Sequence, residues 1–396
     1  MPDIDIEDVA RGLLGKLLRA GEKQSAGVST RRPALTAAAL KPYHDLRSLA
    51  EKEDFEAVLK AARAAGAVTL SWPPDAGERG FVQRVDLIDT NKLAACLGID
   101  TLASKLSKAE ALLGGLLEQF PVLGEILAAW GRLANVRGLS PDDALDFADA
   151  ARTIQYMQDT RDSRPIDQPI REVSARLFRD SKRIERLTGP LTVLLSGDLQ
   201  PERREPSEVW REIGLFREEQ PVRLAGDMVV ACSRVTTRLD APYAAFSADS
   251  IRGLETVPTQ VLTIENLTTF HSEARRRFDD RVLLIYTGGM PSPAWRSMYR
   301  RLLGSVTLGT PVTHWGDIDE GGFRIAAVLA QDAWAVGHVL QPWRMHPNDV
   351  PIEQRKPASE ATFARVRRHA ELAGWTDLGL EIVRAGFVAE QESWTG

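Results

Sequence analysis

The stretch VTHWGDIDEGGFRIAAVL, Val312 to Leu329, decides the fold of the C-terminal half of the chain. It opens with strand-prone residues and then places Asp317, Asp319 and Glu320 within four positions. Two glycines follow, and an apolar helical pattern begins at Phe323. We therefore predict a strand, a tight acidic turn and a helix. Carboxylates at the carboxyl end of a strand are well placed to hold a hard cation such as Mg²⁺.

The bulk composition is that of a globular protein with more than one domain. The chain has 396 residues, of which 43% are hydrophobic and 27% charged. A net charge of −5 gives no overall basic signal, so contact with nucleic acid must rest on local basic patches. The two cysteines, Cys96 and Cys232, argue against a disulfide framework and against a cysteine-based zinc site. The acidic, amphipathic start is no signal peptide and no apolar run predicts a membrane span, so we expect a cytoplasmic protein.

Residues 1–100 carry three helical patterns followed by a hairpin. The helices are predicted over Ile4–Leu18, residues 34–50 and Glu51–Ala65, and Pro42 interrupts or kinks the second of them. The hairpin strands are AVTLSW and FVQRVDLID. This is the order of elements in a winged-helix domain, a common reader of duplex DNA.

In that interpretation, Arg79 at the hairpin tip and Arg84 on its second strand would contact phosphate. Two alternatives remain open at this point. The region can be a small α+β module with a solvated hairpin, or a winged helix that binds protein.

Residues 101–165 are predicted to form a helical connecting arm, because Leu and Ala recur there at helical spacing. Its apolar stripes favour a core or a subunit contact over a cofactor site. Prolines and charges in RDSRPIDQPIR mark a boundary, after which we predict a basic linker over residues 166–205.

The densest basic segment of the chain is IREVSARLFRDSKRIERLTG, Ile170 to Gly189. If it is one helix, Arg179, Lys182 and Arg186 lie on one face. Together with Arg183 they are the cations that we predict to contact the DNA backbone, since phosphate neutralisation uses such clusters. The alternative is a solvated face whose cations pair with neighbouring carboxylates.

Short apolar, β-branched runs alternate with helical patterns in the second half of the chain. The runs PLTVLLSG, MVVACSRV, VLTIEN and RVLLIYTGG suit buried strands. The alternation predicts an α/β domain with a largely parallel sheet over residues 206–396.

One of these predicted strands ends in Glu265, which precedes Asp317 by 52 positions (317 − 265). Carboxylates that are close in space repel one another and are desolvated, and a bound divalent cation makes such an arrangement favourable. A cation held in this way can activate water and stabilise the charge on a reacting phosphate. The pattern therefore predicts a split carboxylate site.

The order of Glu265 and then Asp317-x-Asp319 resembles a toprim domain, the metal-binding domain of topoisomerases, primases and related nucleases. The match narrows further: TIENLTTF, LIYTGGMPSPAW and HWGDIDEGGFRIA, in that order, resemble the C-terminal domain of the JetD family of Wadjet plasmid-defence nuclease subunits. IREVSARLFRDSKRIERL resembles the N-terminal region of that family, and AEQESW its terminal Glu-Gln-Glu element.

The resemblance implies a homodimeric relative of the A subunit of topoisomerase VI that cleaves double-stranded DNA with Mg²⁺ or Mn²⁺. It also implies work beside an SMC-type motor complex that recognises circular plasmids. Glu265, Asp317 and Asp319 become the catalytic and metal-binding carboxylates, and Glu265 can also act as a general acid or base. Glu320 completes the predicted metal set, although the family often has a threonine-histidine pair where this chain has Glu320 and Gly321.

Other functions make different demands on the sequence. A topoisomerase-like transesterase needs a nucleophilic tyrosine on the winged-helix region, where only Tyr43 is available; we favour a partly buried helix tyrosine there. A non-catalytic DNA-binding subunit would use the acidic turn only to cap a helix. Primase-like nucleotidyl transfer is a further toprim chemistry, and no phosphate-binding Gly-x-x-x-x-Gly-Lys-Ser/Thr loop is present. His314 is interpreted as a hydrogen-bonded strand histidine.

Overall fold

The structure is a computed structural model that describes residues 5–75, 77–160 and 166–391. The chain divides into two compact units. The first comprises Met1–Ala151 and Gly189–Pro201, and the second comprises Arg152–Thr188 and Glu202–Gly396. No helix among the described residues is long and apolar enough to cross a membrane.

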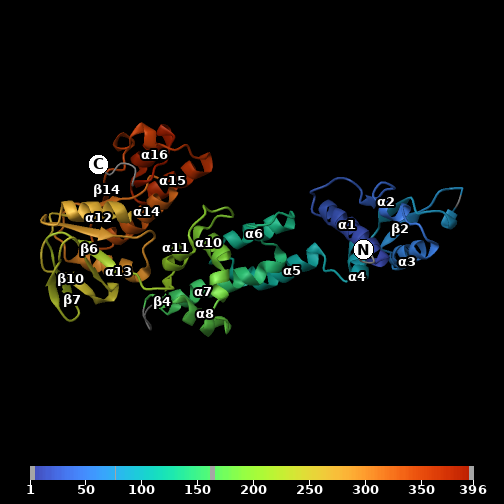
Figure 1. Ribbon diagram of the computed structural model, residues 1–396, viewed down its shortest axis with the longest axis horizontal. Coiled ribbons are helices and arrows are strands. Elements are labelled where there is room, and N and C mark those ends of the chain that lie inside the picture. The colour runs from blue at the N-terminus through green and yellow to red at the C-terminus, as the bar shows by residue number, and fades with distance from the viewer. Residues whose placement is uncertain (1–4, 76, 161–165, 392–396) are drawn as a thin grey trace. The chain divides into compact units, whose positions relative to one another are not determined.

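The N-terminal part of the first unit is a small module of helices and a three-stranded sheet (Figure 1). Its elements are α1 (Ile6–Ser25), β1 (Ala34–Leu35), α2 (Lys41–His44), α3 (Leu49–Ala64), β2 (Val68–Ser71), β3 (Arg84–Leu87) and α4 (Thr90–Leu97). β3 lies between β1 and β2 and is antiparallel to both. Apolar side chains at helical spacing on α1 and α3, including Leu14 and Phe55, are fully buried in the module's core.

One of the predicted helices in this module is wrong. Residues 34–50 do not form one helix, because Ala34 and Leu35 pair with the hairpin strand β3 and only the short α2 is helical. Pro42 lies in the first turn of α2, where a proline needs no hydrogen-bond partner for its nitrogen. Ser48 then starts α3 with a capping box that uses Glu51.

The helical pattern predicted for residues 101–165 is present as α5 (Leu102–Leu113), α6 (Val122–Gly131) and α7 (Ala144–Asp159). The run PLTVLLSG, predicted as a strand, belongs instead to the helix α10 (Thr188–Ser196). Its apolar residues are buried, and a short buried run has no periodicity that separates helix from strand.

The basic segment at the start of the second unit is also not one helix. α8 (Ile170–Phe178) ends where Arg179 adopts a left-handed backbone conformation with φ 55°, and α9 covers only Arg183–Arg186. The predicted common face of Arg179, Lys182 and Arg186 therefore does not exist. β4 (Gln168–Pro169) and β5 (Leu215–Phe216) pair beside this segment, and α11 (Pro206–Glu212) precedes β5.

The second unit is built around a six-stranded mixed sheet with the order β14-β13-β11-β12-β6-β9. Its strands are β6 (Val222–Ala225), β9 (Ala244–Phe246), β11 (Gln260–Ile264), β12 (Val282–Tyr286), β13 (Val312–Trp315) and β14 (Leu340–Pro342). The four strands from β14 to β12 are parallel, and β6 and β9 continue the sheet in antiparallel fashion. A separate small sheet contains β7 (Val229–Cys232), β8 (Thr236–Arg238) and β10 (Ile251–Leu254).

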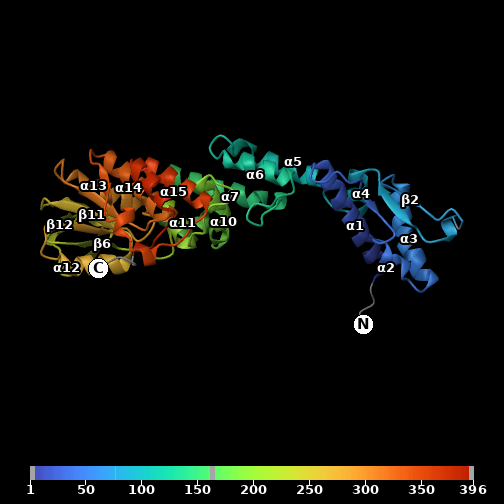
Figure 2. The ribbon, with the colours of Figure 1, turned by 90° about the horizontal axis from the view of Figure 1, so that it is seen from above.

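The order of the parallel strands reverses at β11. The chain moves from β11 to its neighbour β12 through α12 (Leu267–Arg276), and then crosses back through α13 (Pro293–Gly304) to β13 on the other side of β11. Figure 2 shows α13 and α14 (Glu320–Trp334) over one face of these strands and α12 under the other. α15 (Glu360–Leu372) follows and packs against α14, and α16 (Thr376–Ala385) packs against α15. The carboxyl ends of β11 and β13 therefore flank a topological switch point, where open α/β sheets bind their ligands.

Candidate carboxylate site at the switch point of the sheet

Glu265 and Asp317 meet at this switch point. Ile264 and Trp315, the last residues of β11 and β13, are paired in the parallel register. Glu265 follows Ile264 directly, and Asp317 follows Trp315 after Gly316. The backbone N–H of Glu265 donates to the carbonyl oxygen of Trp315 at 3.0 Å. The backbone N–H of Asp317 in turn donates to Oε2 of Glu265 at 3.1 Å. The fold thus brings together two carboxylates that are 52 positions apart (317 − 265).

Asp319 is the N-cap of α14. Its Oδ1 accepts the backbone N–H of Gly322 at 2.8 Å, which fixes the carboxylate at the positive end of the helix. Gly322 has to be glycine, because a Cβ there would overlap the backbone of Asp317. The acidic turn can therefore pack tightly on the first turn of α14.

Glu320 has a different environment from the other three acidic residues. Its side chain is buried, and its Oε2 accepts a hydrogen bond from Nε of Arg365 on α15 at 2.5 Å. This ion pair gives Glu320 a cationic partner within the protein, so its predicted role as a metal ligand has the weakest geometric support in the predicted set.

Two carboxyl groups of the site have pKa values above their ordinary range. Burial, followed by the charges of Asp317 and Asp319, raises the pKa of Glu265 well above its ordinary value. Burial also raises the pKa of Asp319, and the hydrogen bonds from Gly322 and Gly321 oppose that shift only in part. Raised carboxyl pKa values mean that the ionised cluster costs free energy, which a bound cation would offset.

His314 is a buried neutral residue beside this cluster. Burial lowers its pKa to about 3, and its Nδ1 lies 2.9 Å from Oγ1 of Thr263. Its Nε2 has no hydrogen-bond partner among the described residues. A Cβ on Gly316 would lie 2.6 Å from that nitrogen and 2.8 Å from Oε2 of Glu265. A side chain at position 316 would therefore collide with both His314 and the Glu265 carboxylate.

The donor set suits a hard divalent cation, since it consists of carboxylate oxygens. Among the described residues, no group of three His, Cys, Asp or Glu side chains is already gathered as a finished metal-binding cluster. Each of the three carboxylates accepts a backbone hydrogen bond that orients it: Glu265 from Asp317, Asp317 from Gln391 and Asp319 from Gly322. Binding of a cation would therefore have to draw oriented side chains together.

Two further residues reach the site that the sequence analysis did not assign to it. Gln391 donates its backbone N–H to Oδ1 of Asp317 at 2.5 Å. The second is Glu202, near the first turn of α14, which is exposed as a whole although its carboxyl group is partly covered. This partial burial, followed by the charges of Glu320 and Asp319, raises the pKa of Glu202 to about 7. No spacing in the sequence links either position to the acidic turn. For Gln391, the terminal AEQESW element was the one available signal.

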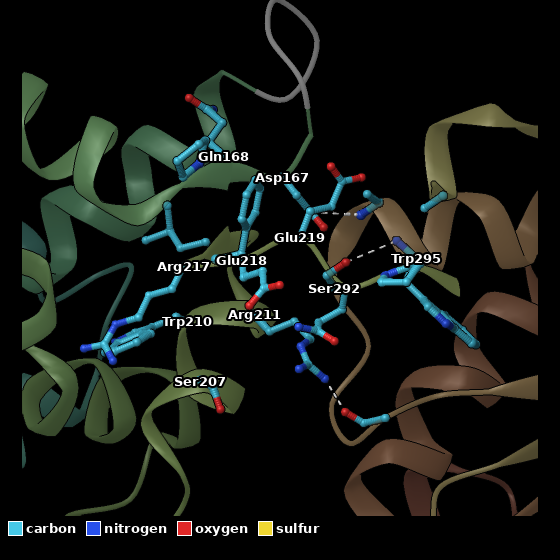
Figure 3. Close-up of a pocket in the computed structure, with 18 of the residues that line it drawn as sticks. Asp167, Gln168, Ser207, Trp210, Arg211, Arg217, Glu218, Glu219, Ser292 and Trp295 are labelled. Atoms are coloured by element: carbon cyan, nitrogen blue, oxygen red, sulfur yellow. Dashed lines mark hydrogen bonds between the residues drawn. The ribbon is translucent and has the colours of Figure 1, made fainter. Parts of the chain in front are cut away.

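A large cavity of the second unit lies elsewhere (Figure 3). It has a volume of about 1230 Å³ and is lined by residues of the α8–α9 segment, of α11 and of the loops after β11 and β12. The three site carboxylates are not among its lining residues. The guanidinium of Arg217 stacks over Trp210 at 4.7 Å from the ring centroid, and Oδ1 of Asp167 accepts the backbone N–H of Ala294 at 3.1 Å.

The charges around this cavity are mixed. Its lining contains five Lys and Arg residues and seven Asp and Glu residues. Since cations do not outnumber carboxylates, the cavity has no excess of positive charge with which to attract a phosphate backbone.

The predicted DNA-contacting residues differ in whether they pair with a carboxylate of the protein. Nε of Arg84 forms an ion pair with Asp86 at 2.8 Å, and Arg186 forms one with Asp180. The side chains of Arg179 and Lys182 are exposed.

Two further predicted cations lie elsewhere. Arg79 ends a short 3-10 turn in the hairpin loop, where its carbonyl oxygen accepts a hydrogen bond from Nζ of Lys52 at 3.1 Å. Arg183 is the first residue of α9. The cations of residues 179–186 are neighbours in the sequence, but the structure does not align them along one face of a helix.

Tyr43 is fully buried in the core of the N-terminal module. Its hydroxyl donates to Oε1 of Glu56 at 2.6 Å and accepts from the backbone N–H of Val82 at 3.2 Å. Burial, followed by the hydrogen bond to Glu56, raises the pKa of Tyr43 far above its usual value. A buried phenol that resists ionisation is a poor nucleophile, which supports our interpretation of Tyr43 as a structural residue.

Fold and site together define an α/β domain whose acidic residues gather where the parallel sheet reverses its strand order. Residues 218–374 match the family model described as Wadjet protein JetD, C-terminal. The chain is also 27% identical over 188 residues to the Wadjet protein JetD of Bacillus cereus (strain Q1). That match covers 45% of this chain and 44% of the relative, so the similarity spans less than half of either protein. The resemblance to the JetD family is therefore confirmed for residues 218–374, which form a JetD-like C-terminal domain.

Proposed function

We propose that the chain is a metal-dependent endonuclease that cleaves double-stranded plasmid DNA as the nuclease subunit of a Wadjet-type complex with an SMC-type motor. The observation that carries this proposal is the meeting of Glu265 and Asp317 at the switch point of the JetD-like domain. A Glu265 carboxylate that accepts the backbone N–H of Asp317, with Asp319 on the same turn, is an arrangement that a toprim-type site would use.

Each acidic residue has its own part in the proposed site. Glu265, Asp317 and Asp319 would hold Mg²⁺ or Mn²⁺ through carboxylate oxygens. Glu320, which pairs with Arg365, would hold the acidic turn in place. The cation, when bound, supplies an activated water and charge stabilisation at the phosphate. Because its pKa is raised, Glu265 is the residue best suited to take up or release a proton near the scissile bond.

The N-terminal module supports the DNA part of the proposal by its order of elements. The order α1-β1-α2-α3-β2-β3, with a hairpin between the last two strands, supports a winged-helix role for this module. In this proposal the module and the exposed Arg179 and Lys182 contact the DNA backbone, and a homodimer places one site opposite each strand of the duplex.

Cleavage of supercoiled and linear plasmid by the purified protein tests the proposal. The reactions contain EDTA, Mg²⁺ or Mn²⁺, with and without a reconstituted SMC-type motor complex. We expect cutting only with a divalent cation, and none by Asp317→Ala. Glu353→Ala, which removes an exposed carboxylate on a different loop, is the matched control and should cut at the parental rate. Equal metal-dependent cutting by Asp317→Ala and the parent would contradict the assignment of the site.

A further inference from the structure

The segment that ends at Gln391 lies across the acidic turn. Ile318 and Ala389 exchange two backbone hydrogen bonds, at 2.8 and 3.0 Å, in the manner of an antiparallel bridge. Val388 and Lys356 form a second such bridge, with both hydrogen bonds at 2.8 Å. Residues 388–391 are therefore held from two sides. We call them the strap.

Gln391 connects the two strand ends that carry the carboxylates. Its backbone N–H donates to Oδ1 of Asp317 at 2.5 Å, and its side-chain Oε1 accepts the backbone N–H of Asn266 at 2.8 Å. Asn266 directly follows Glu265 and caps α12, so this contact fixes the backbone next to Glu265. One residue of the strap thus sets the distance between the loop after β11 and the loop after β13.

The other half of the Gln391 amide has no partner within the described part of the chain. The side chain is fully buried, and its Nε2 has no hydrogen-bond acceptor there. A buried N–H group without a partner destabilises the fold, so a glutamine with a purely structural role would be expected to satisfy both ends of its amide. An unsatisfied donor next to two oriented carboxylates is suited to receive an oxygen of a ligand.

We propose that Gln391 is a positioning residue of the carboxylate site and that its Nε2 donates a hydrogen bond to a phosphate oxygen of the bound DNA strand. The first part acts through Glu265 and Asp317, since the strap sets how far apart they lie. In the second part, the strap contacts the substrate directly through this donor. This inference rests on the proposed nuclease function, because that function supplies the phosphodiester.

Two substitutions separate the two roles. Gln391→Ala removes both the acceptor for Asn266 and the free donor, whereas Gln391→Glu keeps an acceptor oxygen and replaces the donor by a negative charge. Glu390→Ala is the matched control, because Glu390 belongs to the same strap and its exposed side chain pairs with the exposed Lys356.

The experiment measures Mn²⁺ binding by calorimetry without DNA and steady-state cleavage of linear duplex. We expect Gln391→Ala to bind Mn²⁺ about tenfold more weakly, as is common when a residue that orients metal ligands is removed. We expect Gln391→Glu to bind Mn²⁺ at least as well as the parent but to show a KM for DNA raised at least about tenfold, because its charge repels the phosphate. Glu390→Ala should match the parent in both measurements.

The outcomes separate this inference from the proposed function. If the parent binds Mn²⁺ and cuts DNA while both Gln391 variants match it in affinity and KM, the role of Gln391 is refuted and the nuclease function stands. If the parent neither binds Mn²⁺ nor cuts, alone or with the motor complex, the proposed function itself fails and the inference fails with it. Should Gln391→Ala fold poorly, Gln391→Glu decides, because an unchanged KM in that variant also refutes the donor role.

Discussion

The backbone N–H of Asp317 donates to Oε2 of Glu265 at 3.1 Å, across two neighbouring parallel strands. This hydrogen bond orients the carboxylate of Glu265 toward the acidic turn without neutralising it. The charges of Asp317 and Asp319 consequently oppose the ionisation of Glu265, in addition to the effect of burial. Several measurable properties of the protein depend on this relationship.

The first prediction concerns stability as a function of pH. The pKa of Glu265 is raised in the folded state above its ordinary value of 4.5, so its ionised form opposes folding. Its contribution to stability is fully present below pH 4.5 and is lost as the pH rises toward the folded-state pKa. In EDTA at pH 8, Glu265→Gln should raise Tm by about 2–4 °C, equivalent to ~1 kcal/mol, and at pH 4 it should leave Tm unchanged. Calorimetry at both pH values checks this; a lower Tm for the variant at pH 8 would contradict it.

The second prediction concerns the tight packing of the acidic turn. Gly322→Ala places a Cβ against the backbone of Asp317, which cannot move without displacing the turn. We expect a loss of about 2–4 kcal/mol in the free energy of unfolding. Gly304→Ala is the control, because nothing lies within 4 Å of a Cβ built at that exposed position of α13. Urea denaturation followed by circular dichroism compares the two, and equal midpoints would show that the turn tolerates a side chain.

The third prediction concerns Tyr43. Tyr43→Phe removes the hydroxyl that bonds Glu56 and the backbone of Val82, and we expect a loss of about 1–2 kcal/mol in stability. Metal-dependent cutting per folded molecule should persist, since the proposed nuclease uses water. A stable Tyr43→Phe protein that no longer cuts, while the parent forms a covalent adduct with DNA, would instead support the transesterase.

The fourth prediction compares exposed with paired cations. Arg179 and Lys182 have exposed side chains, whereas Arg186 is paired with Asp180. Arg179→Ala with Lys182→Ala should weaken duplex DNA binding by roughly tenfold and reduce the slope of log affinity against log salt by about 1–2. Arg186→Ala should have a smaller effect. Fluorescence anisotropy at several salt concentrations measures both, and an unchanged salt slope in the double variant would remove this segment from the DNA interface.

Part of the site was predictable from the sequence, and the reasons are physical. Glu265 and Asp317 each follow a buried β-branched run, and the carboxyl ends of adjacent parallel strands meet at one edge of a sheet. The alternation of strands and helices also predicted the α/β fold. Gln391 could not be found in this way, because its contacts depend on a strap that arrives from 74 positions beyond Asp317 (391 − 317).

Local ambiguities explain the errors. Residues 190–197 have the short apolar run of a strand but lie in the buried helix α10. The basic segment has helical spacing throughout, yet it breaks at Arg179, a residue type that rarely adopts a left-handed conformation. Ala34 and Leu35 have a helix-favouring composition, but they form a strand that pairs with the hairpin strand β3.

The most direct test of the central claim is a calorimetric titration of Mn²⁺ into the metal-free protein at pH 8, beside Asp317→Asn and Glu353→Gln. The account predicts saturable binding to the parent and to Glu353→Gln, and at least about a hundredfold weaker binding to Asp317→Asn, because one charged oxygen ligand is replaced by a neutral amide. Binding of Mn²⁺ to Asp317→Asn with the parental affinity would show that the carboxylates at the switch point are not the metal site.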